Sequence, residues 1–241
     1  MASLWQPFER SVVEFLTRTT LSQDEFVKFL AGAYTVATTP ISLKYSTGTI
    51  TQPVINGVLK QKILRDALTK MLNTNSTKSE QLAFLDYLPA AIGFLKYWTP
   101  GIGVLISPLP AAPPCFAPIV AGFTISQDDL NQALDFAGVD QIQPATGNDL
   151  KAKIISSAVV NDPVVLLPSP IVLFPGNPIQ LAKDLHFAMS RSFTPQATAK
   201  NLVKAFKNHL SSIVGIYIGF KDPATPPQPL PFTIVVFNGI S

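Results

Sequence analysis

The feature that most constrains this chain is the absence of charge from three proline-rich segments. Thr99–Thr124 and the apolar run Pro163–Ala182 contain no charged residue, and Asp222–Ser241 contains none after Asp222. Proline lacks a backbone donor and ends or kinks helices, so none of these segments can be one regular helix. A membrane-spanning helix needs about 20 consecutive apolar residues in helical form. We therefore predict no transmembrane span.

The same segments carry Val, Ile, Leu and Phe, and leaving such side chains in water is costly. We therefore expect the segments to dock as extended arms. Charged residues make up 14% of the 241 residues, against about 25% in typical soluble domains. Other protein surfaces or a membrane must then cover part of the apolar surface. The net charge of +3 gives no reason to predict specific nucleic-acid binding.

Apolar periodicity predicts amphipathic helices over much of the remaining sequence. The clearest start signal is Ser22–Glu25, which matches a capping box. A short strand is expected near Leu43–Tyr45. The fold class is therefore predicted as mainly α with short β segments. The expected helices cover Leu4–Arg18, a stretch opening at Ser22, a stretch opening at Asn56–Gly57, Ser79–Trp98, a stretch opening at Ser126, Lys151–Val159, Asn177–Ser190 and a stretch opening at Thr194 whose apolar stripe runs to Tyr217.

Two sequence matches indicate an internal duplication. Leu21–Phe26 matches Ile125–Leu130, and Pro113–Val120 resembles Pro226–Val235. One interpretation is two similar helical halves, residues 1–124 and 125–241, each ending in a Pro-rich apolar segment. The other is that capping boxes and proline-rich loops recur by chance. Both interpretations stay open at this point.

The sequence offers little catalytic chemistry. His186 and His209 are the two histidines, and each is interpreted as a surface or partly buried helix residue. Cys115 has no basic neighbour in sequence to lower its pKa and is interpreted as a packing thiol. No metal-binding or phosphate-binding motif occurs. The prediction is that the protein is not an enzyme and has no catalytic residue, metal or cofactor.

Basic side chains recur on two of the predicted helices. Lys60, Lys62, Arg65 and Lys70 share one helix, and a second row lies on the last helix. Such rows are usually solvated helix faces. The N-terminal residues lack the pattern of a signal peptide, and one cysteine excludes an internal disulfide. We therefore expect a chain that is made and kept in a reducing compartment.

The aromatic helix ends at Tyr97–Trp98 and Tyr217–Gly219, each followed by prolines, and the terminal apolar strand resemble parts of virion structural proteins of tailed bacteriophages or other large DNA viruses. The resemblance implies a non-enzymatic structural subunit of a capsid, neck, tail or baseplate. It also implies synthesis in the host cytoplasm, a place in the virion, and copies of itself or other structural proteins as partners. The alternative is a membrane-associated or lipid-binding protein that uses its apolar surface.

The C-terminal segment is the strongest candidate for protein interaction. Its prolines favour an extended backbone, which lowers the entropy cost of ordering it on a partner. The apolar residues after them alternate as in a strand. The other interpretation is that the segment folds back on its own half. The predicted interaction residues are Pro226, Pro227, Pro229, Pro231, Phe232, Ile234, Val236 and Phe237.

Overall fold

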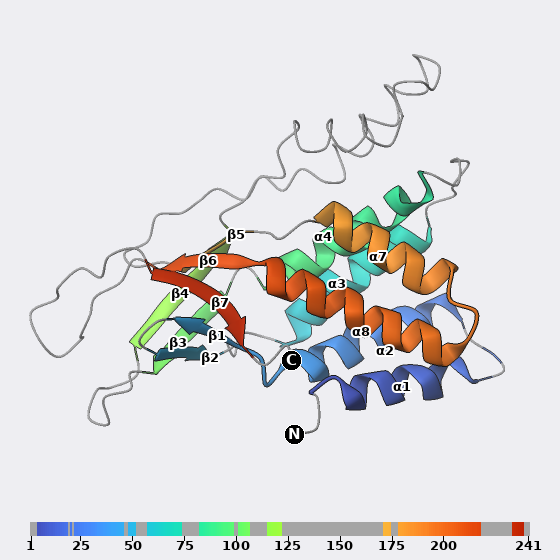
Figure 1. The fold of residues 1–241 in the computed structure, drawn as a ribbon, viewed down its shortest axis with the longest axis horizontal. Coiled ribbons are helices and arrows are strands. Elements are labelled where there is room, and N and C mark those ends of the chain that lie inside the picture. The colour runs from blue at the N-terminus through green and yellow to red at the C-terminus, as the bar shows by residue number, and fades with distance from the viewer. Residues whose placement is uncertain are drawn as a thin grey trace, which may run out of the picture.

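The chain is mainly helical in the residues that the computed structural model describes (Figure 1), as the apolar periodicity predicts. These residues are 4–18, 20, 22–45, 48–51, 57–73, 82–98, 101–106, 115–121, 171–174, 178–217 and 233–238. Within them lie six α-helices and one 3-10 helix, η1. The helices are α1 (Gln6–Leu16), α2 (Gln23–Thr38), α3 (Gly57–Leu72), η1 (Ala83–Tyr87), α4 (Leu88–Lys96), α7 (Pro178–Ser190) and α8 (Pro195–Ser212).

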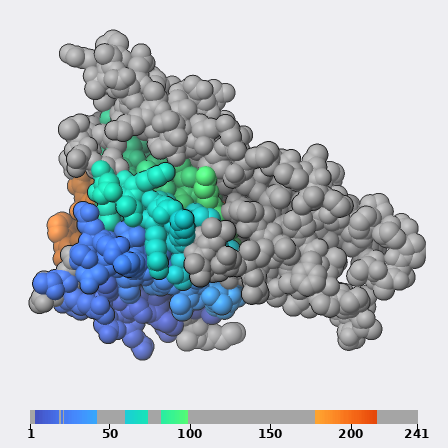
Figure 2. Space-filling view, turned by 180° about the vertical axis from the view of Figure 1, so that it is seen from behind, coloured from blue at the N-terminus to red at the C-terminus, as the bar shows by residue number. Residues whose placement is uncertain are grey.

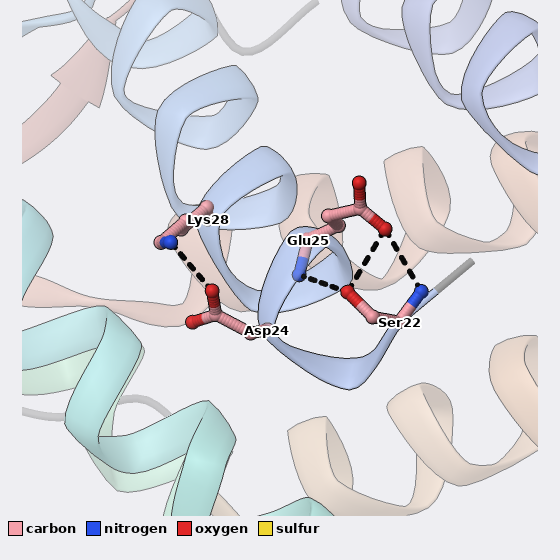
Figure 3. Close-up of polar contacts among 4 residues, drawn as sticks. All are labelled: Ser22, Asp24, Glu25 and Lys28. Carbon is pink, nitrogen blue, oxygen red and sulfur yellow. Dashed lines mark hydrogen bonds and ion pairs between the residues drawn. The ribbon is translucent and has the colours of Figure 1, made fainter.

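Local end signals fix where several helices begin. The capping box at the start of α2 is confirmed, since the backbone N–H of Glu25 donates to Ser22 Oγ at 3.2 Å. The Ser22 N–H donates in return to Glu25 Oε2 at 3.0 Å (Figure 3). At the start of α8, Thr194 Oγ1 accepts from the Ala197 N–H at 3.1 Å. These side chains satisfy donors that the first helical turn leaves without partners.

Two predicted helix ranges are wrong in extent. The stretch expected as one helix over Ser79–Trp98 contains η1 followed by α4, and Pro89 occupies the first turn of α4. Proline is tolerated in a first turn but breaks a helix interior, so the longer helix cannot form. The last helix ends at Ser212, because Ile213 adopts an extended conformation. The residues after it form a strand that pairs on both sides, which a continued helix would not allow.

Seven short strands form one closed sheet at one end of the helical body (Figure 1). Each strand pairs with the next along the chain, and β1 also pairs with β7. The β4–β5 pair is parallel and the other pairs are antiparallel. The strands are β1 (Ser42–Tyr45), β2 (Gly48–Thr51), β3 (Gly101–Ile106), β4 (Cys115–Ala121), β5 (Ile171–Phe174), β6 (Val214–Tyr217) and β7 (Thr233–Asn238).

The helices share one hydrophobic core. Helix α8 packs on α1 and α7, and α7 also packs on α4 and η1. The buried cluster therefore joins residues from both predicted halves, such as Trp5 and Tyr34 with Leu185 and Phe206. The second capping sequence, Ile125–Leu130, lies outside the described residues. The internal duplication and the division at residue 124 stay predictions.

A close approach between α3 and α4 depends on Gly93. A Cβ atom at position 93 would overlap the Ala67 Cβ on α3. We expect Gly93→Ala to lower the free energy of unfolding by about 1–2 kcal/mol, because the helices must separate and this outweighs the better helix propensity of alanine.

The control for Gly93→Ala is its double mutant with Ala67→Gly, which removes the overlapping methyl group. In urea unfolding, the pair should be at least about 1 kcal/mol more stable than the sum of the two single effects predicts. Strictly additive effects would show that this contact does not set the spacing of α3 and α4.

Candidate functional site

The predicted C-terminal interaction residues fall partly within the described chain. Ile234, Val236 and Phe237 belong to β7, whose backbone pairs with β1 and β6 of the same chain. Phe232 and the four prolines lie outside the described residues. The pairing matches the interpretation in which the tail folds back on its own chain. The role of these residues in protein interaction stays a prediction.

Several large apolar side chains lie exposed on the helical body. Phe193 is 98% exposed, Val36 is 71% exposed and Phe187 is 56% exposed. They lie on different elements, with Val36 on α2, Phe187 on α7 and Phe193 in the link between α7 and α8. Sequence reasoning did not single out any of the three. Exposed aromatic side chains of this kind are enriched in protein interfaces.

The link that carries Phe193 is held by its neighbours on both sides. Asn201 Nδ2 donates to Ser192 Oγ at 3.0 Å, which ties the link to the side of α8. Thr194 caps α8 with both its side chain and its carbonyl group. The Phe193 ring is therefore presented to solvent from a fixed backbone. Because the backbone of the link is already ordered, covering Phe193 costs mainly the rotamer freedom of its side chain.

The interior contains a chain of buried polar groups among aromatic rings. Trp98 Nε1 donates to the Tyr34 hydroxyl at 3.2 Å, and Thr38 Oγ1 donates to the Tyr34 carbonyl oxygen at 2.8 Å. Thr38 Oγ1 also lies 3.3 Å from the Tyr97 hydroxyl. Burial raises the pKa of the Tyr34 hydroxyl far above its ordinary value. The Tyr34 hydroxyl is therefore neutral, and the hydrogen bonds fix the positions of the rings.

Lys60 corrects the interpretation of its row as a solvated face. Its side chain is only 6% exposed, and its Nζ lies 4.9 Å from the Tyr97 ring centre and 5.7 Å from that of Trp98. No hydrogen-bond partner for Nζ lies among the described residues. Burial lowers the pKa of Lys60 to about 8. A lowered pKa favours a reactive amine, but this amine is closed off from solvent. It therefore acts as a buried cation over the faces of the two aromatic rings.

The histidines and the cysteine occupy three different environments. His209 is 4% exposed on α8, so the interpretation as a surface or partly buried residue is wrong for this histidine. Burial lowers its pKa to about 3, and neither ring nitrogen has a hydrogen-bond partner in the described chain. His186 is half-buried, with its ring 5.3 Å from that of Tyr87. Cys115 begins β4, where its backbone pairs with Leu105. The three residues lie on three different elements, α8, α7 and β4.

Within the described ranges, no three His, Cys, Asp or Glu side chains are grouped so that they could hold a metal ion. In the same ranges, no helix is long and apolar enough to cross a bilayer. The site with the clearest chemical character is therefore the exposed apolar surface, above all Phe193. Comparison with protein-family models, with curated proteins and with solved structures gave no match for this chain.

Proposed function

We propose that this protein is a non-enzymatic structural subunit of a large assembly, with a virion as the assembly that its sequence favours. The observation that carries the proposal is Phe193, 98% exposed on a link that hydrogen bonds hold in place. Burying a phenylalanine side chain contributes about 1.5–3 kcal/mol. An exposed aromatic ring on an ordered backbone therefore suits an anchor that enters a pocket on a neighbouring subunit. The low charge of the chain supports the same function.

The first experiment tests the anchor. Phe193→Ser should leave the unfolding midpoint almost unchanged, since the ring contributes little burial to the isolated chain. It should weaken assembly at least tenfold in light scattering across a concentration series, alone or with co-expressed virion proteins. Phe193→Leu is the matched control and should retain most of the assembly. Equal assembly by all three proteins would contradict the role of Phe193.

Purified virus particles give an independent test of the proposed place in a virion. Mass spectrometry of purified particles should detect the protein at a fixed ratio to the other structural proteins. Its absence from particles, combined with a monomeric state at every concentration, would overturn the proposed function.

The C-terminal segment supports the same proposal through strand exchange. Strand β7 forms backbone hydrogen bonds with β1 and β6. The β7 strand of a neighbouring copy can form the same hydrogen bonds with β1 and β6. Exchange of an identical element is a low-cost route to assembly. In this proposal the prolines from Pro226 to Pro231 span the distance between subunits, and Phe232, Ile234, Val236 and Phe237 dock on the neighbour.

Deletion of Phe232–Ser241 tests this strand exchange. We expect the truncated chain to keep its helical circular dichroism, because the helical core lies outside the deleted residues. The truncated chain should no longer enter the assembly. If it becomes insoluble as an isolated chain, the segment belongs to the core of its own subunit, and strand exchange is wrong.

A further inference from the structure

A groove of about 750 Å³ opens between α1 and α2, and we call it the α1–α2 groove. Figure 2 shows these N-terminal helices, in blue, at the surface of the molecule. Phe8 and Phe29 contribute to the apolar lining, as do Ala33 and Ala37. Gly32 also lines the groove, and no atom lies within 4 Å of the place where its Cβ would be. The missing side chain therefore leaves room within the groove.

The two ends of the groove differ in chemistry. Phe15, late in α1, stacks on Phe29, early in α2, at 4.1 Å, so the two consecutive helices run antiparallel. Among the described lining residues, the charged ones are Arg10 and Lys28, and both are basic. Leu4, just before α1, and Pro40, just after α2, lie at the other end, where Gln6 is the one polar residue among the described lining residues. At 1.5 Å per helical residue, the lining of α2 and the turn after it extends about 18 Å.

Lys28 and Arg10 differ in whether an ion pair already neutralises the side chain. Lys28 forms an ion pair with Asp24, one turn earlier on α2 (Figure 3). Asp24 does not line the groove. Arg10 is exposed and forms no ion pair with another described residue. An anionic group at this end would therefore meet the unpaired Arg10 and would share Lys28 with Asp24, and no carboxylate is among the described lining residues.

We propose that the α1–α2 groove binds one long-chain fatty acid, with its carboxylate beside Arg10 and Lys28 and its acyl chain directed toward Leu4. The volume falls in the range of small-molecule sites. Most of the described lining residues are apolar, as in sites for apolar small molecules. Each buried methylene contributes about 0.8 kcal/mol, so a long chain can bind stably in an open groove. The site gives the lipid-binding alternative a location, and it does not depend on the assembly role.

Gly32 allows the groove to be blocked without harm to the fold. Gly32→Phe places a ring in the open space, and replacing a helical glycine also improves helix propensity. Gly32→Ala is the matched control, because it adds only a methyl group. Arg10→Gln removes the unpaired charge and keeps a polar side chain. The fold of each variant is checked by thermal unfolding.

The probe is cis-parinaric acid, titrated below its critical micelle concentration and followed by fluorescence. The wild type and Gly32→Ala should bind one molecule saturably, with palmitate as a competitor. Gly32→Phe should bind at least tenfold more weakly. Arg10→Gln should lose about threefold to tenfold, and the methyl ester of the probe should bind the wild type with a similar loss.

Three results would overturn the fatty-acid site. These are the absence of saturable binding to the wild type, equal binding by Gly32→Phe, and equal binding of acid and ester. Association with phosphatidylserine vesicles without binding of the monomeric acid would also overturn it, since this result would indicate a membrane-contact surface. None of these outcomes bears on the Phe193 assembly test, which uses different residues and another measurement.

Discussion

Tyr34→Ala should lower the free energy of unfolding by about 3–5 kcal/mol, the range for removing a large aromatic ring from a core. Tyr34 is fully buried, and its ring centre lies 4.7 Å from that of Phe94, 4.9 Å from that of Phe206 and 5.2 Å from that of Tyr97. The substitution removes these contacts and leaves a cavity where α2, α4 and α8 meet. Equilibrium unfolding in urea, followed by circular dichroism, measures the loss.

Two further variants on α2 separate the causes of the Tyr34→Ala loss. Tyr34→Phe keeps the ring and removes the hydroxyl that accepts from Trp98 Nε1, so it should cost about 1–2 kcal/mol. Val36→Ala is the exposed control on the same helix and should change stability by less than about 0.5 kcal/mol. A loss below about 2 kcal/mol for Tyr34→Ala would show that this ring is not central to the core.

His209 should make the folded chain sensitive to mild acid. Burial lowers its pKa to about 3 in the folded chain, against an ordinary value of 6.5. Between these values the unfolded chain binds a proton that the folded chain does not, so stability falls as the pH decreases below 6.5. The loss attributable to this residue should be near zero at pH 7.5 and about 2 kcal/mol at pH 5.

His209→Leu tests this pH dependence, because leucine fills the buried position without a titrating group. The stability of the variant relative to the wild type should rise by about 2 kcal/mol between pH 7.5 and pH 5. Leu202→Ala, at another buried position of α8, is the control and should lower stability by a similar amount at both pH values. Parallel pH profiles for wild type and His209→Leu would show that His209 is hydrated or paired in the folded chain.

The helix starts could be predicted because their signals are local. Ser22 with Glu25, Pro178, and Thr194 with Pro195 each act within one turn, and the structure begins helices at these positions. The sheet could not be predicted in the same way. Strands β5 and β6 gain their stability from partners far away in sequence. Local propensity does not identify such partners, which is why the last helix was expected to continue to Tyr217.

Two buried titratable residues could have been found from spacing alone. Lys60 lies four residues before Leu64 and eight before Leu68, which places it on the buried stripe of α3. His209 lies three residues after Phe206 and seven after Leu202, on the buried stripe of α8. In both cases the position on the helix, and not the polar side-chain type, decides burial. The exposure of Phe193 and the α1–α2 groove depend on how whole helices pack, so no local pattern indicates them.

The pairing of β1 with β7 has a consequence for synthesis on the ribosome. Ser42 pairs with Asn238, so the sheet closes between the first strand and the last. A nascent chain can form α1 and α2 early, but the free edges of β1 and β6 must wait for β7 to emerge. Until then each chain carries two unpaired edges, which can pair with another chain. When several chains are translated close together, the β7 strand of a neighbour can pair with these edges if it leaves the ribosome before the chain's own β7.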